Sequence, residues 1–303
     1  MSIVDKIFYN KSSAEKLGWE PSWFGVKDFD ETLVKNIRKF QRSCELTVDG
    51  LCGPMTYRRI KTEREYTQEM KDYPDGNFIV CDGEKVPINW DAINILDKDS
   101  YALPDNCYRT YKPKKRKISM IVTHWDVCLS AKSCHRVLKR KGISSHFVID
   151  NDGTICQMVD TQHEAWHAGT RKVNKVSVGI DFSNGYYTKY NKYYRRKGFG
   201  PRPILREVPV HTTVLKEFLG YYPVQIQAYE ALLKCLHKHY NIPLECPLDD
   251  TGALLTKVHP LARQGKFKGV VNHYHLTNRK IDCAGLKVDK ILQRVRDSIE
   301  FED

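Results

Sequence analysis

Two histidines and one aspartate have the residue types and positions expected of metal ligands. His124 ends the apolar run Ile118–Thr123, and His273 follows the shorter run Gly269–Val271. Asp282 lies beyond His273 in a polar segment. Two imidazoles and one carboxylate leave a fourth position open, which is typical of a catalytic zinc site, whereas a structural site has four protein ligands. Because the chain has 11 histidines, each single histidine is a weak predictor, and the assignment needs further support.

Alternating strand and helix patterns position these residues. Short runs rich in β-branched residues indicate buried strands, and the turn at 151–153 predicts a β-hairpin. Apolar residues at steps of three and four indicate amphipathic helices. The expected strands cover 118–123, 146–150, 154–159, 176–182 and 269–271, and the expected helices cover 130–141, 224–240 and 288–299.

The first 65 residues predict a separate helical module. Asp30 is a suitable N-cap for a helix with Leu33, Ile37 and Phe40 on one face, and a second helix begins near Pro54. We therefore expect three parts: a helical domain at 1–65, a linker or edge segment at 66–117, and a catalytic domain at 118–303. The basic run Lys112–Lys117 is interpreted as a solvated linker, with a nucleic-acid patch as the alternative.

The composition and charge of the chain limit the classes of protein and of partner that fit it. The chain has 303 residues, of which 41% are apolar and 28% charged, and its 49 basic and 37 acidic residues give a net charge of +12. An anionic partner such as nucleic acid, a membrane or a bacterial wall would match this charge. No apolar run approaches the length of a membrane span, no secretory signal is evident, and the ten cysteines contain no CxxC pair, so we expect reduced thiols.

Five ordered motifs between residues 118 and 290 resemble the zinc-dependent N-acetylmuramoyl-L-alanine amidases of the second type. This superfamily includes phage amidase lysins and peptidoglycan recognition proteins. The resemblance implies an α/β fold with a mixed central sheet flanked by helices. The segment 48–56, VDGLCGPMT, resembles a type-1 peptidoglycan-binding domain, which is a small all-α wall-binding module. The five motifs are Ile121–Trp125, Ser144–Asp150, Ala165–Gly169, Val176–Asp181 and the pair Asn272–His273 with Lys280–Asp282.

The resemblance implies Zn²⁺ as cofactor, with His124, His273 and Asp282 as its ligands. Lys280 would stabilise the oxyanion formed when water attacks the amide. Asp181 takes the position of a glutamate base in many relatives. Other relatives use a tyrosine where this chain has Ser145, so Asp181 is the base by elimination.

Three further residues are assigned to substrate binding. Trp166 and His167 belong to the motif AWHAG, where His167 is expected to line the cleft. His146 is either cleft-lining or a buried structural histidine. Cys283 directly follows Asp282 and is expected to pack rather than to ligate zinc.

The implied reaction is hydrolysis of the bond between N-acetylmuramic acid and L-alanine in peptidoglycan. We expect a phage endolysin, monomeric, that is made in the host cytoplasm and reaches the wall once the membrane is opened. A cytosolic wall-recycling amidase and a non-catalytic peptidoglycan receptor are the alternatives, and neither nucleic acid nor membrane insertion is expected. The Tyr- and Arg-rich stretch 185–223 either walls the substrate groove or is a stabilising surface excursion.

Overall fold

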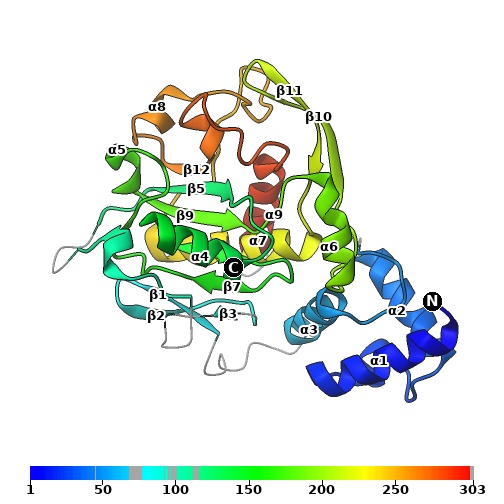
Figure 1. Cartoon of the computed structure of the whole chain (residues 1–303). Coiled ribbons are helices and arrows are strands. Elements are labelled where there is room, and N and C mark those ends of the chain that lie inside the picture. The colour runs from blue at the N-terminus through cyan, green and yellow to red at the C-terminus, as the bar shows by residue number, and fades with distance from the viewer. Residues whose placement is uncertain are drawn as a thin grey trace.

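The computed structural model describes residues 1–44, 46–67, 77–91, 93–94, 96, 101–111 and 116–300. The start of the basic run, 112–115, lies outside these residues. The described chain forms a group of N-terminal helices beside a mixed α/β body built on a six-stranded sheet (Figure 1). The predicted fold class is therefore confirmed.

The N-terminal helices form around a small core of their own. Asp30 caps the second long helix by accepting a hydrogen bond of 2.8 Å from the Leu33 amide, as the sequence predicts. Leu33 and Ile37 then pack against aromatic rings of the same module. Gln41 closes the turn at 49–50, because its amide nitrogen donates to Asp49 Oδ1. The helices are α1 (Ile3–Leu17), η1 (Pro21–Phe24), α2 (Glu31–Ser43) and α3 (Pro54–Thr67).

The central sheet brings the ends of the predicted strands to one edge. Its order is β12-β5-β9-β6-β7-β3, and the strands run parallel except for the antiparallel pair β6 and β7. The carboxyl ends of β12, β5 and β9 therefore lie side by side. The strands are β12 (Gly269–Asn272), β5 (Met120–Trp125), β9 (Ser177–Phe182), β6 (Phe147–Ile149), β7 (Ile155–Gln157) and β3 (Ile93–Asn94).

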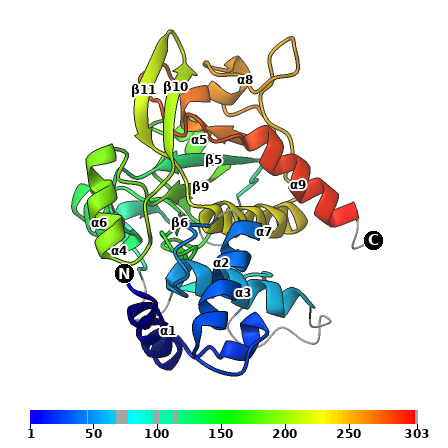
Figure 2. The same ribbon diagram turned by 90° about the vertical axis from the view of Figure 1, so that its right-hand side faces the viewer.

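Helices cover both faces of the sheet, and strand β5 carries apolar side chains on both sides. Ile121 faces the main core together with α7 (Pro223–Tyr240) and α9 (Val288–Glu300). Met120 and Val122 face the opposite side, toward α5 (Arg171–Asn174) and α8 (Pro260–Arg263). Helix α4 (Ala131–Lys141) lies on this second side, across the sheet from α7 (Figure 2). The predicted helices at 130–141, 224–240 and 288–299 are confirmed.

The remaining elements lie around this framework. The stretch 185–223 contains a short helix and a long antiparallel hairpin, where the sequence patterns predict no regular structure. The elements are β1 (Phe78–Cys81), β2 (Glu84–Pro87), η2 (Asp105–Cys107), β4 (Tyr108–Arg109), β8 (Glu164–Ala165), η3 (Thr188–Tyr190), α6 (Asn191–Arg196), β10 (Ile204–Val210), β11 (Thr213–Leu219) and η4 (His273–His275).

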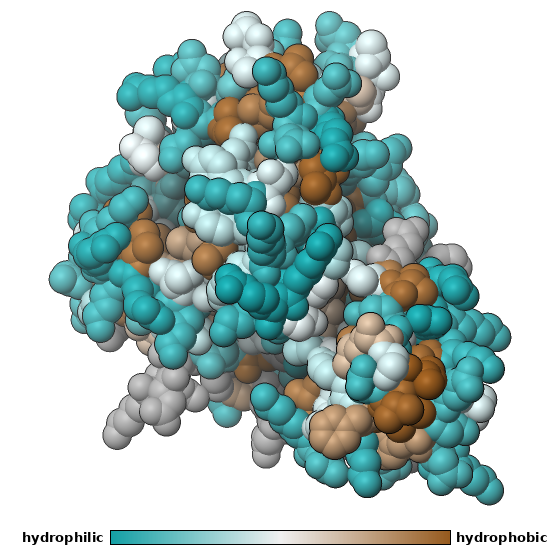
Figure 3. Space-filling view, turned by 45° about the vertical axis from the view of Figure 1, so that its right-hand side comes forward, coloured by the Kyte–Doolittle hydropathy of each residue, from teal (hydrophilic) through white to brown (hydrophobic). Residues whose placement is uncertain are grey.

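The face of the molecule seen in Figure 3 is largely hydrophilic, with an apolar patch on the N-terminal helices. Val4 and Phe8 of α1 are 70% and 73% exposed. All ten cysteines are free thiols, as expected. Among the helices that the structure describes, none combines the length and the apolarity required to cross a bilayer.

Candidate functional site

The three predicted metal ligands meet at the carboxyl edge of the sheet. His124 lies near the end of β5, His273 follows the neighbouring strand β12, and Asp282 reaches both from the loop before α9. The Nδ1 atoms of the two histidines are 3.0 Å apart. Asp282 Oδ2 lies 3.3 Å from His124 Nδ1 and 2.9 Å from His273 Nδ1. All three side chains are buried, so the fold holds three donor atoms in one enclosed position.

The chemistry of these donors fits a zinc ion. A tetrahedral ion with ligand distances of about 2.0–2.1 Å separates its ligands by roughly 3.3 Å, close to the spacing in this cluster. Although burial opposes the charged form, hydrogen bonds from His124 and His273 hold the pKa of Asp282 well below its usual range. Burial and the neighbouring His124 lower the pKa of His273. An ionised carboxylate and a neutral imidazole are the forms that bind a metal.

Asp181 lies next to the donor cluster on the adjacent strand. The register of β5 and β9 pairs it with His124, so both side chains leave the sheet on the same face. Burial raises the pKa of Asp181, although the charges of His124 and Lys280 oppose this shift. A carboxylate with a raised pKa at this position is suited to accepting a proton.

Lys280 lies in the exposed loop between His273 and Asp282. Its positive charge acts on both Asp181 and His273, whose pKa values it lowers. The ammonium group is therefore within electrostatic range of the donor cluster. Its main-chain oxygen accepts a hydrogen bond of 2.8 Å from His211 Nε2, a residue that no sequence motif singles out.

His167 contacts Nε2 of His124, the ring nitrogen that does not face the other donors, and links His124 to strand β9. His124 Nε2 is 3.0 Å from His167 Nδ1, and His167 Nε2 is 3.2 Å from the Ser177 hydroxyl. Ser177 donates in turn to the main-chain oxygen of Val173. The ring occupies the space above Gly179, where an added Cβ would lie 2.6 Å from it. Because a metal-bound histidine usually uses its second nitrogen to hold its orientation, this geometry fits a supporting role for His167.

The other two residues assigned to substrate binding, His146 and Trp166, have different surroundings in the structure. His146 is fully buried, accepts the Gly179 amide at Nδ1, and has Nε2 3.0 Å from the His163 oxygen. Of the two alternatives for His146, this position favours the buried structural histidine. Trp166 is half-buried, and its main-chain amide donates to the Ser144 hydroxyl.

Arg116 corrects the interpretation of the basic run as a solvated linker. Its side chain is only 6% exposed, and its guanidinium donates to the main-chain oxygens of Thr161, Asn174 and Ser177. Burial lowers its pKa to about 10. Lys117 beside it is exposed. A run of like charges gives no signal that one member turns inward, because that depends on carbonyl groups far away in the sequence.

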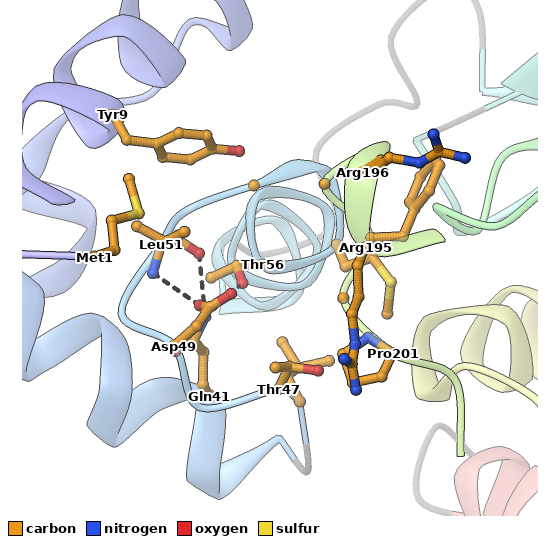
Figure 4. Close-up of a pocket in the computed structure, with 16 residues that line it drawn as sticks. Met1, Tyr9, Gln41, Thr47, Asp49, Leu51, Thr56, Arg195, Arg196 and Pro201 are labelled. Atoms are coloured by element: carbon orange, nitrogen blue, oxygen red, sulfur yellow. Dashed lines mark hydrogen bonds between the residues drawn. The ribbon is translucent and has the colours of Figure 1, made fainter. Parts of the chain in front are cut away.

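A cavity of about 390 Å³ lies apart from these residues, between the N-terminal helices and the segment 195–201. Figure 4 shows Tyr9 and Asp49 on one wall, with Arg195 and Pro201 on the other. The two walls approach closely beside it, since a Cβ on Gly53 would lie 3.2 Å from the Gly198 oxygen. This part of the 185–223 stretch therefore packs on the N-terminal helices and not on the metal donors.

The fold and the donor cluster define a mixed α/β protein with a candidate catalytic metal centre. The chain belongs to the N-acetylmuramoyl-L-alanine amidase family, because the sequence model of that family, Amidase_2, matches residues 114–284, which is more than half of the chain. A search of curated proteins found no match.

Solved structures of amidases are similar to parts of this chain. The N-acetylmuramyl-L-alanine amidase AmiD from E. coli is 24% identical, with 45% of this chain and 49% of AmiD covered and a TM-score of 0.31. AmpDh3 from Pseudomonas aeruginosa is 21% identical, with 64% and 65% covered and a TM-score of 0.38. The amidase LysC from Clostridium intestinale is 16% identical, with 67% and 97% covered and a TM-score of 0.38. The chain thus spans less than two thirds of the length of AmiD and AmpDh3.

Proposed function

We propose that this protein is a zinc-dependent amidase that cleaves the bond between N-acetylmuramic acid and L-alanine in bacterial peptidoglycan. The observation that carries the proposal is the convergence of His124 Nδ1, His273 Nδ1 and Asp282 Oδ2 within 3.3 Å of one another. Membership of the amidase family supports the choice of bond. Two imidazoles and one carboxylate with an open fourth position support the choice of metal.

The residues around the donors supply the remaining steps of hydrolysis. Zinc, when bound, polarises the substrate carbonyl and lowers the pKa of a bound water to about 7. Asp181 takes a proton from the attacking water and passes it to the amide nitrogen as the carbon–nitrogen bond breaks. The Lys280 ammonium stabilises the negative charge that develops on the carbonyl oxygen. His167 orients the His124 ring, and Trp166 is our candidate for substrate contact.

We further propose that the protein acts as a phage endolysin, with its N-terminal helices binding the wall. Such binding would raise the concentration of substrate at the catalytic site. The net charge of +12 would add attraction to an anionic wall. In this setting the protein is made in the host cytoplasm and reaches peptidoglycan once the membrane has been opened.

Digestion of purified peptidoglycan with and without a chelator, followed by mass analysis, tests the proposal. We expect free stem peptides that begin at L-alanine, formed only when zinc is present. Intact wall under both conditions, with the protein pelleting alongside it, would overturn the catalytic assignment and identify a receptor. Cleavage of soluble muropeptides without cleavage of wall would retain the amidase and replace the endolysin role with wall recycling.

A further inference from the structure

The hairpin β10–β11 stands beside the segments that carry the candidate site (Figure 2). Its two strands pair from Ile204 with Leu219 to Val210 with Thr213, which leaves His211 and Thr212 as a two-residue turn at the tip. His211 has a φ of +55°, a left-handed conformation that is uncommon for residues other than glycine. The tip therefore places a histidine where turn geometry alone would favour glycine or asparagine.

The base of the hairpin packs against strand β5, which carries His124, and against the segment that follows Asp282. Phe218 of β11 has its ring 5.4 Å from the ring of Trp125, the residue after His124. A Cβ on Gly285, three residues after Asp282, would lie 2.6 Å from Leu205 of β10. These contacts fix the base of the hairpin relative to the site.

His211 at the tip binds the loop of Lys280. His211 Nε2 donates to the main-chain oxygen of Lys280 at 2.8 Å, and the His211 amide donates to the Thr256 oxygen at 2.7 Å. The His211 ring also meets the Tyr274 ring edge-on, with 6.2 Å between centroids. One residue thus joins the hairpin to the segments before and after His273.

We propose that His211 is a positioning residue that fixes the main chain of Lys280, so that the lysine ammonium stays directed toward the reacting carbonyl. This inference rests on the proposed amidase function. The Lys280 side chain is exposed and flexible. Its placement therefore depends on the main chain from which it extends, and a small displacement there is costly to catalysis.

Three variants of His211 distinguish the effect of its hydrogen bond from the effect of the turn conformation. His211→Gly relieves the left-handed conformation but removes the ring and its donor, and His211→Ala removes the ring and its donor while a Cβ stays in the left-handed conformation. His211→Gln keeps an amide donor at a position similar to Nε2. We expect kcat on a defined muramyl-L-alanyl peptide to fall about tenfold in the Gly and Ala variants, roughly the effect of one hydrogen bond, and to recover in part in the Gln variant. KM and zinc affinity should not change, and Thr212→Ala at the same turn is the matched control.

Hydrogen exchange of the amides at 277–282 gives a readout that does not need activity. We expect faster exchange in His211→Gly than in the wild type and in Thr212→Ala. Equal exchange in all three proteins, or a wild-type kcat in His211→Gly, would overturn the role of His211. An inactive wild type that still shows the exchange difference would instead reject the amidase function and retain the contact.

Discussion

Asp282 and Cys283 are neighbours in the chain but have different surroundings in the fold. Asp282 directs Oδ2 to the two histidine nitrogens, and hydrogen bonds from them keep it ionised. Cys283 is fully buried, and burial together with the charge of Asp282 raises the pKa of its thiol well above the usual range. A thiol in this state is a poor metal ligand, because the thiolate is the form that binds.

Substitution of each residue by alanine should therefore give opposite results. We expect Asp282→Ala to lower zinc affinity at least about 100-fold, with activity lost in parallel, because one of three protein ligands is removed. Cys283→Ala should retain one zinc per chain and most of the activity. Equilibrium dialysis against zinc measures both. Zinc retained by Asp282→Ala and lost by Cys283→Ala would reverse the assignment of the ligand.

The two donor histidines stand out in the sequence because each lies at the end of an apolar run, which is a local feature. Their assignment as metal ligands together with Asp282 comes from the resemblance to the amidases and stays a prediction. His124 ends an apolar run whose burial can be read from its composition, and His273 ends another. Strands β5 and β12 are parallel neighbours, so their carboxyl ends lie at the same edge of the sheet. The bond from His211 to Lys280 joins residues 69 positions apart through an inserted hairpin, so no local pattern contains it.

Strands can likewise be predicted where local sequence determines them, and they are missed where distant contacts do. The β-branched run 176–182 is confirmed as β9, Ser177–Phe182, because Val178, Ile180 and Phe182 alternate along it and every residue of the strand is buried. The hairpin β10–β11 is not predicted because both its strands are largely exposed and β10 contains Pro209. Proline within a run normally argues against a strand, and it is accepted here because the two strands form a sheet by themselves.

Arg116 stabilises several elements at once. Its guanidinium bonds to main-chain oxygens at Thr161, at Asn174 in α5 and at Ser177 in β9. We expect Arg116→Lys to lower the free energy of unfolding by about 3 kcal/mol or more, because a lysine reaches fewer of these carbonyls and each unsatisfied one costs about 1–3 kcal/mol. Urea denaturation measures the change. The exposed neighbour provides the control, and Lys117→Met should change stability by less than about 0.5 kcal/mol. Equal effects of the two substitutions would contradict the anchoring role.

At the scale of the whole molecule, buried histidines make stability depend on pH. Burial, together with the charge of Arg116, lowers the pKa of His146 well below its usual value. As the pH falls through about 6.5, the unfolded chain therefore binds a proton at His146, whereas His146 stays neutral in the folded chain. Stability from this residue is complete above that pH and is lost as the pH falls below it.

We expect the free energy of unfolding to fall between pH 7 and pH 5. His146→Asn should reduce the slope by up to about 1.4 kcal/mol per pH unit, the value for one proton, whatever its effect on absolute stability. Urea denaturation of the metal-free protein at a series of pH values measures both slopes. An unchanged slope in His146→Asn would mean that His146 is protonated in the folded protein.

The N-terminal helices are joined to the α/β body by apolar and ionic contacts. Leu46 and Met55 belong to the main core cluster together with residues of α7 and of the sheet. Asp91, whose side chain is 4% exposed, pairs with Arg58 and, at 3.1 Å, with Lys61, and both cations lie on α3. Because burial isolates these charges from water, their pairing is expected to be stronger than that of a surface ion pair.

Removal of this carboxylate tests whether the two parts unfold together. We expect Asp91→Ala to destabilise the protein by about 2–4 kcal/mol, since two partly buried cations lose their partner. Its calorimetric trace should show an earlier transition for the N-terminal helices, where the wild type unfolds as one unit. Glu31→Ala removes only the exposed pair with Lys35 and should leave the midpoint within about one degree. A single transition at the wild-type midpoint in Asp91→Ala would mean that the apolar contacts alone hold the helices on the α/β body.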